Sequence, residues 1–557
     1  MRSFLEYITS EHCALVCNLL AKERVKLGSK NKLGRESDEK IKDLMPSRNQ
    51  WIRLRQSTRH KGISRDAQKI LAIRKTIIAD RKNCCRTDVT APDYLKELGK
   101  FTSEITAIVS GKVPALFTAD DFSIIPKFKE DEGENAIYRP LCTYNNLQTK
   151  TLISAASSYF TQHFDNYLHE DILSYRPRRS YKGTMTITSG HDAIKGIQDY
   201  IQRHPHQNIY VAECDIQKFF DIINHDVVLD CFDRLAQEVG LPEYHQVRNI
   251  LKAYLDSYGF VPNVLNLNND PSYWYMALKK HKGTVKGQCL FKWVIEEEFL
   301  KAYTAEEFAQ VRNKLGVPQG GALSCVISNV VLNDVDKVIT NTKDDDRFFV
   351  RYGDDIILMH TDKKKCEELL ENYKQSLIDH KLIYHKFSDF SDLKNKEKNT
   401  KKFWKGKSKP VFLWGPGEGN ASEWIGFVGY EINRDGGTRL RLSTLNKKFG
   451  KINKSYHKCL ESKTKNDTKI IGKARENIEK LPTTLEDFTE LRLYPGLYMS
   501  KPLSHQLKSL DRYRYNKLAK LDSKLSTRCG YQVDLTTYFR DNDQFSFYKS
   551  CVKTDRR

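Results

Sequence analysis

Apolar residues along this chain follow two different periods, and the change from one to the other predicts a mixed α/β protein. The stretch NIYVAECDI (208–216) is rich in β-formers and ends at a carboxylate, as a core strand leading into a site would. The stretch FFVRYGDDIILMH (348–360) has apolar runs on both sides of a glycine turn and predicts a hairpin. Together these segments indicate the centre of a β-sheet.

Helical spacing is found on both sides of the hairpin. Residues 322–339 predict a buried helix, with an apolar face formed by Leu323, Val326, Ile327, Val330, Val331, Val335 and Val338. Residues from about 363 to 381 predict a second helix, with an apolar face formed by Cys366, Leu369, Leu370, Tyr373 and Leu377. Strand-like runs and Gly-rich turns alternate over 410–443 and predict a compact antiparallel unit.

The chain is long and basic. Its 557 residues exceed what one core usually serves, so two to four domains are expected. Lys and Arg number 92 against 71 Asp and Glu, and the net charge of +21 favours a nucleic-acid partner over a merely solubilising surface. The densest basic block lies at 22–65, where a nucleic-acid-binding arm and a solvated helical face are both open.

The cysteines and the hydropathy indicate in which cellular compartment the protein is found. The 13 cysteines form no CxxC pair, which argues against a zinc ribbon or a disulfide framework and fits a reducing cytoplasm. No apolar run approaches the roughly 18 residues of a membrane span, and the N-terminal stretch reads as an amphipathic helix. We therefore expect a cytoplasmic protein that is not bound to a membrane.

Two adjacent carboxylates, Asp354 and Asp355, stand behind Gly353 in the hairpin. Like charges beside a core need neutralisation, by a Lys or Arg or by Mg²⁺, whose preferred ligands are carboxylate oxygens. If the 208–216 strand lies beside the hairpin, Asp215 and Asp354 together could hold two Mg²⁺ ions roughly 4 Å apart, with Mn²⁺ as a substitute. Such a site predicts nucleotidyl transfer.

Three motifs occur in a fixed order: DIQKFFD (215–221), PQGGALS (318–324) and RYGDD (351–355). In this order they resemble bacterial reverse transcriptases, the enzymes of group II introns, retrons and defence-associated or abortive-infection systems. The likeness extends over roughly 110–450 and includes RPL (139–141), SYRPRRS (174–180) and GFVGYEI (426–432), which is similar to a primer-grip hairpin. Alanine often stands in the family where this chain has Gly353, and proline where it has Cys325.

The resemblance implies roles for individual residues. As metal ligands it implies Asp215 and Asp354, with Asp355 as their companion and the backbone of Ile216 as a further contact. Around the incoming nucleotide it implies Phe220 as the gate beneath the sugar, Gln319, Arg139 and Lys127, with Lys218 and Phe219 beside them. Phe220 and Gln319 also have ordinary interpretations, as a core aromatic and as a helix-capping amide. Lys386 is a candidate proton donor for pyrophosphate.

The implied fold class is α/β (α+β), a right-hand polymerase with an antiparallel-sheet palm, helical fingers and a helical thumb. We expect a basic helical N-terminal extension at 1–110, fingers at 111–204, a palm at 205–442, and a thumb with a C-terminal helical region at 443–557. Asp215 and Asp354 lie about 140 residues apart, which is longer than the family usually needs. An insertion near 240–312 is therefore expected.

The implied activity is the addition of deoxynucleotides to a 3′ end, templated by RNA. The partners would be an RNA template, expected to be a non-coding RNA, the DNA product and deoxynucleoside triphosphates, and a homo-oligomer is left open. The sequence has neither the retron VTG tract nor an intron-type nuclease tail, which favours the enzymes of bacterial antiviral defence. An RNA-dependent RNA polymerase usually has Asp where Phe220 stands, and an inert RNA-binding scaffold would be expected to lose Asp215 and Asp354; both alternatives stay open.

Overall fold

The computed structural model describes residues 1–10, 14–29, 36–54, 65–86, 90–119, 121–126, 138–179, 185–188, 190–265, 301–341, 343–391, 400–415, 421–460 and 501–529. The chain forms two compact units, each built from separated stretches. The first comprises Met1–His169, Ile216–Val338 and Tyr373–Ile383, and the second comprises Glu170–Asp215, Ile339–Asn372 and Tyr384–Arg557.

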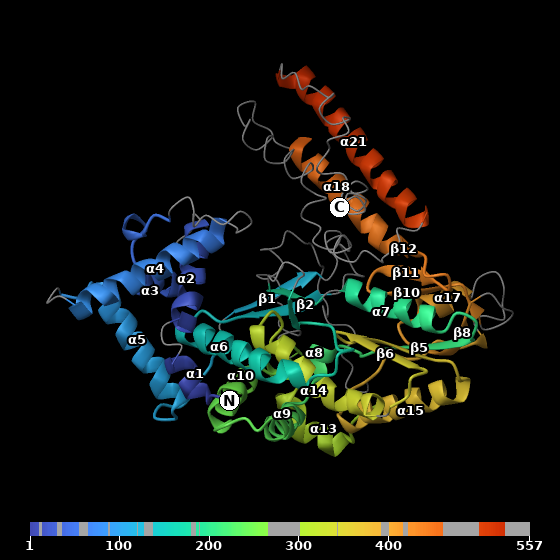
Figure 1. Cartoon of the computed structure of the whole chain (residues 1–557), viewed down its shortest axis with the longest axis horizontal. Helices are drawn as coiled ribbons and strands as arrows, with labels where there is room; N and C mark the ends of the chain where they lie inside the picture. Colours follow the sequence, from blue (N-terminus) through green and yellow to red (C-terminus); the bar gives the residue numbers. More distant parts are fainter. Residues whose placement is uncertain are drawn as a thin grey trace. The chain divides into compact units, whose positions relative to one another are not determined.

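The elements of the first unit are mainly helical (Figure 1). They are α1 (Phe4–Ser10), α2 (Ala14–Ser29), α3 (Glu36–Asp43), α4 (Arg65–Arg86), α5 (Asp93–Val109), β1 (Asp121–Pro126), β2 (Tyr138–Thr143), α6 (Leu147–Phe164), α8 (Phe219–Ile222), α9 (His225–Val239), α10 (His245–Asp256), α13 (Ala305–Val311) and most of α14 (Ala322–Thr340). Strands β1 and β2 form an antiparallel pair.

The start of the chain belongs to the core of this first unit. Helix α1 packs against α6, where the rings of Phe4 and Tyr7 meet the Tyr159 ring edge-on at 5.1 and 5.2 Å. The backbone N–H of Leu5 donates to Gln246 Oε1 of α10 at 2.8 Å. The first helix of the expected N-terminal extension is thus packed on helices that follow much later in the sequence.

The second unit contains the main sheet. Its elements are β3 (Pro177–Arg179), β4 (Met185–Ile187), α7 (Gly190–Arg203), β5 (Ile209–Asp215), β6 (Arg347–Tyr352), β7 (Asp355–His360), most of α15 (Lys363–Asp379), α17 (Thr400–Lys405), β8 (Lys409–Trp414), β9 (Ala421–Ser422), β10 (Trp424–Phe427), β11 (Tyr430–Asn433), β12 (Thr438–Leu440), α18 (Leu442–Leu460) and α21 (Lys501–Cys529). Among these described strands, the main sheet has the order β6-β7-β5-β8-β9.

One face of the main sheet carries both a core and the candidate chemistry, because side chains alternate along a strand. On this face β5 and β7 pair Val211 with Met359, Glu213 with Ile357 and Asp215 with Asp355. Helix α7 contacts β6 and contributes its apolar stripe to the core, which also takes residues from β10 to β12 and from α18 and α21. The apolar part of the face thus anchors the strand ends that carry the carboxylates.

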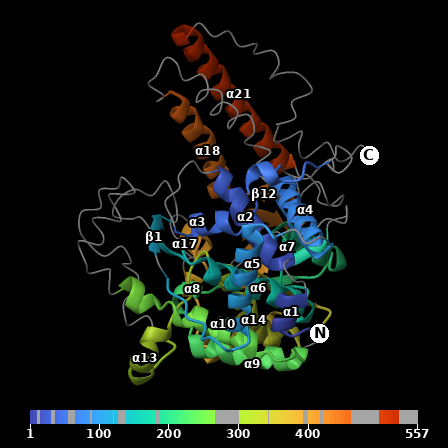
Figure 2. The same cartoon turned by 90° about the vertical axis from the view of Figure 1, so that its left-hand side faces the viewer.

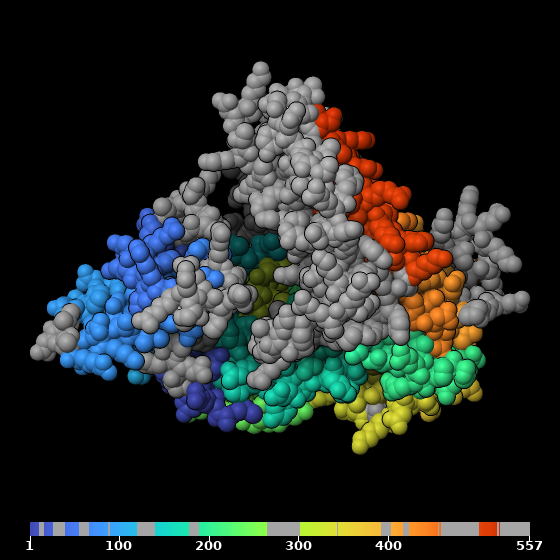
Figure 3. All heavy atoms as spheres, turned by 45° about the horizontal axis from the view of Figure 1, so that its top comes forward, coloured from blue at the N-terminus to red at the C-terminus, as the bar shows by residue number. Residues whose placement is uncertain are grey.

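A small antiparallel sheet and two long helices complete this unit. Strands β10, β11 and β12 pair in order, and Gln506 of α21 hydrogen-bonds both backbone groups of Leu440 at the end of β12. Helices α18 and α21 run side by side (Figure 2), and α21, in red, lies at the surface of the face drawn in Figure 3. The ring of Tyr513 packs edge-on against Phe449 between these helices.

Most of the elements expected from periodicity are present, with two corrections. On the predicted face of helix α14, Val326 is half-buried and Val338 is 37% exposed, while Ile339, next to Val338 in the last turn, is fully buried. Strand β8 joins the main sheet beside β5, whereas the sequence placed it in a separate antiparallel unit with the strands that follow. Within the described helices, none has the length and apolarity that a membrane crossing requires.

Candidate active site

A tight turn places two of the predicted metal ligands. Tyr352 pairs with Asp355 across the hairpin, so Gly353 and Asp354 form a two-residue loop. Gly353 has φ +74° while Asp354 has no positive φ, which is the pattern of a type II′ turn. The buried guanidinium of Arg351 donates from Nη1 to the Gly353 carbonyl at 3.1 Å and holds the turn.

Strand register brings the third predicted carboxylate to the same end of the sheet. Asp215 is the last residue of β5 and lies opposite Asp355, the first residue of β7. The predicted residues Asp215, Asp354 and Asp355 therefore meet at one edge, which we call the carboxylate edge. The side chain of Asp215 is buried, that of Asp354 is half-buried and that of Asp355 is exposed.

A lysine that the sequence reasoning missed neutralises Asp215. Glu213 pairs with Lys409 across the antiparallel strands β5 and β8, so Lys407, two residues earlier, comes next to Asp215. The Lys407 ammonium donates to Asp215 Oδ2 and approaches His385 Nε2 at 3.1 Å. His385 Nε2 is itself 3.7 Å from Asp215 Oδ2. Asp215 thus has a cationic neighbour and an imidazole beside it.

Backbone contacts fix this arrangement. The N–H of Asp215 donates to Ser408 Oγ at 3.1 Å, and the N–H of His385 donates to the Asp215 carbonyl at 2.9 Å. The pair of Lys409 with Glu213, 2.5 Å apart, is buried beside them. Lys386, the proton donor suggested by the sequence, is exposed, whereas its neighbour His385 faces Asp215.

The carboxylate edge is electrostatically crowded. Surrounding protein atoms, and then the negative charges of Asp215 and Asp354, raise the pKa of the Asp355 carboxyl to about 7, although Lys407 and Arg441 act in the opposite direction. The Asp355 side chain nevertheless has one side open to solvent. The three carboxylates of the edge therefore carry more negative charge than Lys407 and Arg441 can balance.

The predicted nucleotide residues Phe220 and Gln319 lie in the first unit. Lys218 takes a left-handed conformation (φ +51°) that turns the chain into α8. There Phe219 is buried and Phe220 is half-buried, their rings edge-on at 5.2 Å. Gln319 ends the segment 315–319, here called the glutamine loop, and its Nε2 donates to Asp221 Oδ1 at 2.6 Å. Sequence reasoning named Phe220 and Gln319 but not Asp221.

Of the residues expected to contact the triphosphate, Arg139 is described by the structure and Lys127 is not. Arg139 lies on β2, paired with Ile125 of β1, and the backbone of the same strand reaches the glutamine loop because Cys142 N–H donates to the Gln319 carbonyl at 3.2 Å. Lys127 lies outside the described residues. Ile216 is buried and directly follows Asp215.

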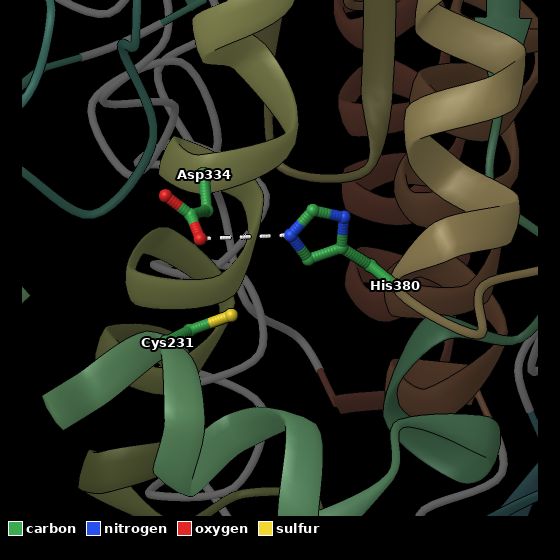
Figure 4. A group of neighbouring side chains, drawn as sticks. All are labelled: Cys231, Asp334 and His380. Atoms are coloured by element: carbon green, nitrogen blue, oxygen red, sulfur yellow. Dashed lines mark ion pairs between the residues drawn. The ribbon is translucent and has the colours of Figure 1, made fainter. Parts of the chain in front are cut away.

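A second group of possible metal ligands lies on α9, α14 and the residue after α15 (Figure 4). In the described part of the chain it is the only set of three His, Cys, Asp or Glu ligand atoms lying within 4.8 Å of one another: Cys231, Asp334 and His380. Arg234 already occupies it, with Nη2 2.6 Å from Asp334 Oδ2 and 3.2 Å from Cys231 Sγ. A metal would have to displace this guanidinium.

The same group is explained by ion pairing. His380 Nδ1 donates to the Ser376 carbonyl at 2.7 Å, and its Nε2 lies 3.6 Å from Asp334 Oδ2. Burial opposes protonation, but the hydrogen bonds to Asp334, Cys231 and Ser376 raise the pKa of His380 to about 10. The pKa of Asp334 is lowered despite burial, by His380 and Arg234. This network joins three helices without an ion.

Comparison with known proteins identifies the class of protein. Residues 125–387 match the family model described as reverse transcriptase (RNA-dependent DNA polymerase). This stretch contains the carboxylate edge residues Asp215, Asp354 and Asp355 together with Phe220 and Gln319. The chain thus carries a reverse transcriptase domain and is an RNA-directed DNA polymerase, which is a nucleotidyltransferase. Its palm-like antiparallel sheet and many helices confirm the expected fold class.

Solved structures that are similar to this chain include two telomerases. The telomerase from Candida albicans, in complex with a TWJ fragment of telomeric RNA, is 15% identical with a TM-score of 0.33, over 89% of this chain and 76% of that chain. The apo telomerase from Candida tropicalis is 13% identical with a TM-score of 0.34, over 94% of this chain and 83% of that chain. No curated protein matches the chain.

Proposed function

We propose that this chain copies RNA into DNA by two-metal catalysis at the carboxylate edge. The observation that carries the proposal is the register of β5 with the β6–β7 hairpin, which sets Asp215 opposite Asp355 with Asp354 in the adjoining turn. In this proposal Asp215 and Asp354 are the metal ligands, and Asp355 and the backbone carbonyl of Ile216 complete the site.

The donor set at this edge fits magnesium. Mg²⁺ takes carboxylate oxygens and keeps positions for substrate phosphates, and Mn²⁺ is a chemically similar substitute. The raised pKa of Asp355 reflects unbalanced negative charge, which a divalent cation would neutralise. Bound there, the ions would activate the primer 3′-hydroxyl and stabilise the departing pyrophosphate.

Lys407 has two roles in this proposal. Its ammonium is the counter-ion of Asp215, and its side chain is half exposed, so it can leave the carboxylate without unfolding the strand. Because it lies next to the carboxylate edge, it is also better placed than Lys386 to give a proton to the leaving pyrophosphate. His385, hydrogen-bonded to Lys407, would orient it.

The motifs support roles in nucleotide recognition for Phe220, Gln319 and their neighbours. Phe220 would form the floor of the sugar pocket, and Gln319 would contact the nucleotide from the glutamine loop. The cationic side chains of Arg139, Lys127 and Lys218 would meet the triphosphate, Arg being suited by its forked donors. Phe219 would support the Phe220 ring, which it already meets edge-on.

The biological role is inferred from the motifs and the net charge. The likeness of the motifs to those of bacterial defence-associated enzymes supports a cytoplasmic role in antiviral defence, with a non-coding RNA as template. The net charge of +21 supports extensive contact with nucleic-acid phosphates.

Primer extension by the purified full chain tests the proposed function. With an RNA template and Mg²⁺ we expect deoxynucleotides to be added in preference to ribonucleotides, and chelation of the metal to stop the reaction. Asp215→Asn should be inactive, while Asp345→Asn, an exposed carboxylate two residues before the hairpin begins at Arg347, should match wild type. A preference for ribonucleotides would indicate an RNA polymerase, and RNA binding without extension would indicate an inert scaffold.

A further inference from the structure

Asp221 is a buried carboxylate that the reaction as proposed above does not use. It directly follows the gate residue Phe220 in α8 and is 6% exposed. Its Oδ1 accepts a hydrogen bond from Nε2 of Gln319 at 2.6 Å. A carboxylate is costly to bury unless its oxygens are hydrogen-bonded, so an apolar residue would be the simpler choice if this position served packing alone.

The glutamine loop does not depend on this contact for its position. The N–H of Val317 donates to the Phe220 carbonyl at 2.8 Å, and the N–H of Gly316 donates to the Ile223 carbonyl at 2.8 Å. The imidazole of His225 lies 2.6 Å from the Gly316 carbonyl. These bonds attach the loop backbone to α8 and to the start of α9. What Asp221 adds is therefore control of the Gln319 side chain.

That control selects one orientation of the amide. The terminal torsion of a glutamine is broad and nearly two-fold, so the amide alone has little preference for which end faces the protein. An ionised carboxylate only accepts hydrogen bonds, so it binds the NH₂ end and directs the carbonyl oxygen away from itself. Burial and the nearby Asp221 charge raise the pKa of Tyr258 well above its usual value, which keeps that phenol protonated beside the carboxylate.

We propose that Asp221 is a positioning residue that presents the Gln319 amide, in one fixed orientation, to the incoming deoxynucleotide beside the Phe220 gate. The inference rests on the proposed function, because it assigns Gln319 to the nucleotide. The gate and the amide are then linked through neighbouring residues. The Phe220 carbonyl holds the backbone of the glutamine loop, and the Asp221 carboxylate holds the Gln319 amide. Sugar selection should therefore depend on Asp221 although it does not touch the substrate.

The test compares kinetic constants of single-nucleotide addition for Asp221 variants. Asp221→Leu removes the acceptor, and we expect the KM for deoxynucleotides to rise about tenfold with a smaller change in kcat, because a lost hydrogen bond to a charged group weakens nucleotide binding. The preference for deoxynucleotides over ribonucleotides should fall as well. Asp221→Asn offers a donor as well as an acceptor, so it no longer selects one orientation of the Gln319 amide, and its KM should lie between those of wild type and Asp221→Leu. Asp226→Leu, an exposed carboxylate five residues later, is the matched control.

A double-variant cycle separates positioning from folding. In a Gln319→Leu background, Asp221→Leu should change KM little further, because the side chain that it positions is gone. If Asp221→Leu does not fold, Asp221→Ser replaces it throughout, since serine is too short to reach Gln319 but can be hydrated.

Unchanged KM and sugar preference in the folded Asp221 variants, or equal effects with and without Gln319, would overturn the inference while leaving the proposed function intact. Wild-type protein that extends no primer with any nucleotide would overturn both.

Discussion

The carboxylate edge and the glutamine loop are built in opposite ways. At the edge, like charges crowd together, and the pKa of Asp355 is raised to about 7 by the protein atoms around its carboxyl and by Asp215 and Asp354. At the loop, successive residues are hydrogen-bonded to α8 and α9 through Gly316, Val317 and Gln319. The first region holds repelling charges at close quarters, whereas the second is held together by its own hydrogen bonds.

This difference has a physical reason. To stabilise charge that develops during a reaction, a site needs groups whose own charges are not fully balanced beforehand. Such groups lower the stability of the folded protein. Recognising a nucleotide requires groups held rigidly before it arrives, and hydrogen bonding that holds them adds stability. Mutations should therefore separate activity from stability at the edge and couple them at the loop.

The largest effect is expected at the edge. Asp354→Asn removes one anion from the crowded set, so nucleotide addition should fall by on the order of 10²- to 10³-fold or more. The midpoint of thermal unfolding should stay unchanged or rise, since repulsion with Asp355 and Asp215 is relieved. Single-turnover primer extension and a thermal melt measure the two quantities.

The exposed Asp345→Asn substitution, two residues before the hairpin begins at Arg347, is the control, and neither quantity should change. A folded Asp354→Asn protein with wild-type rates would contradict the assignment of Asp354 as a metal ligand. A large loss of stability would contradict the claim that this edge is strained by its own charge.

The edge was largely predictable because its signals are local. The turn at Gly353 and the alternating residues around it define a hairpin, and a strand that ends in Asp215 is recognisable without its partners. Lys407 was missed because it lies 192 residues from Asp215 in the sequence and reaches it only through the pairing of β8 with β5. Local alternation identifies a strand but not the sheet that it joins.

The glutamine loop was predictable only in part, for a similar reason. The motif identified Gln319, but its hydrogen bond to Asp221 spans 98 residues, and no periodicity reports such a contact. The exposure of Val338 is a different case: Ile339, the next residue, is fully buried, so helical spacing alone assigned the wrong residue of the last turn to the buried face.

Two glycines with positive φ allow the regions to be compared directly. A β-carbon on Gly353 (φ +74°) meets no atom within 4 Å, so Gly353→Ala should cost only the conformational strain, about 1–2 kcal/mol. A β-carbon on Gly316 (φ +85°) lies 2.9 Å from the Asp221 carbonyl oxygen. Gly316→Ala should therefore cost more, about 2–5 kcal/mol when a steric term of about 1–3 kcal/mol is added to the strain.

Chemical denaturation of the two variants measures this difference. Gly240→Ala is a useful reference, because Gly240 also has positive φ (+67°) with open space around it and caps α9 away from both regions. Equal losses for Gly316→Ala and Gly353→Ala would mean that the glutamine loop is no more tightly packed than the hairpin turn.

The smallest expected effect concerns the choice of sugar and depends on Phe220. Its ring is half-buried and edge-on to Phe219, so it offers a surface against which a 2′-hydroxyl would clash or lose its hydrogen bonds to water. Phe220→Ala opens that space and should shift the preference toward ribonucleotides by roughly tenfold, which corresponds to about 1.4 kcal/mol. Single-nucleotide extension on an RNA template, with each triphosphate in turn, measures the ratio of deoxynucleotide to ribonucleotide incorporation.

The control is Phe390→Ala, which removes a partly buried ring that stacks on Phe403 and should leave this ratio unchanged. An unchanged ratio in Phe220→Ala would make Phe220 a packing residue, and would leave the glutamine loop rigid but without a part in selecting the sugar.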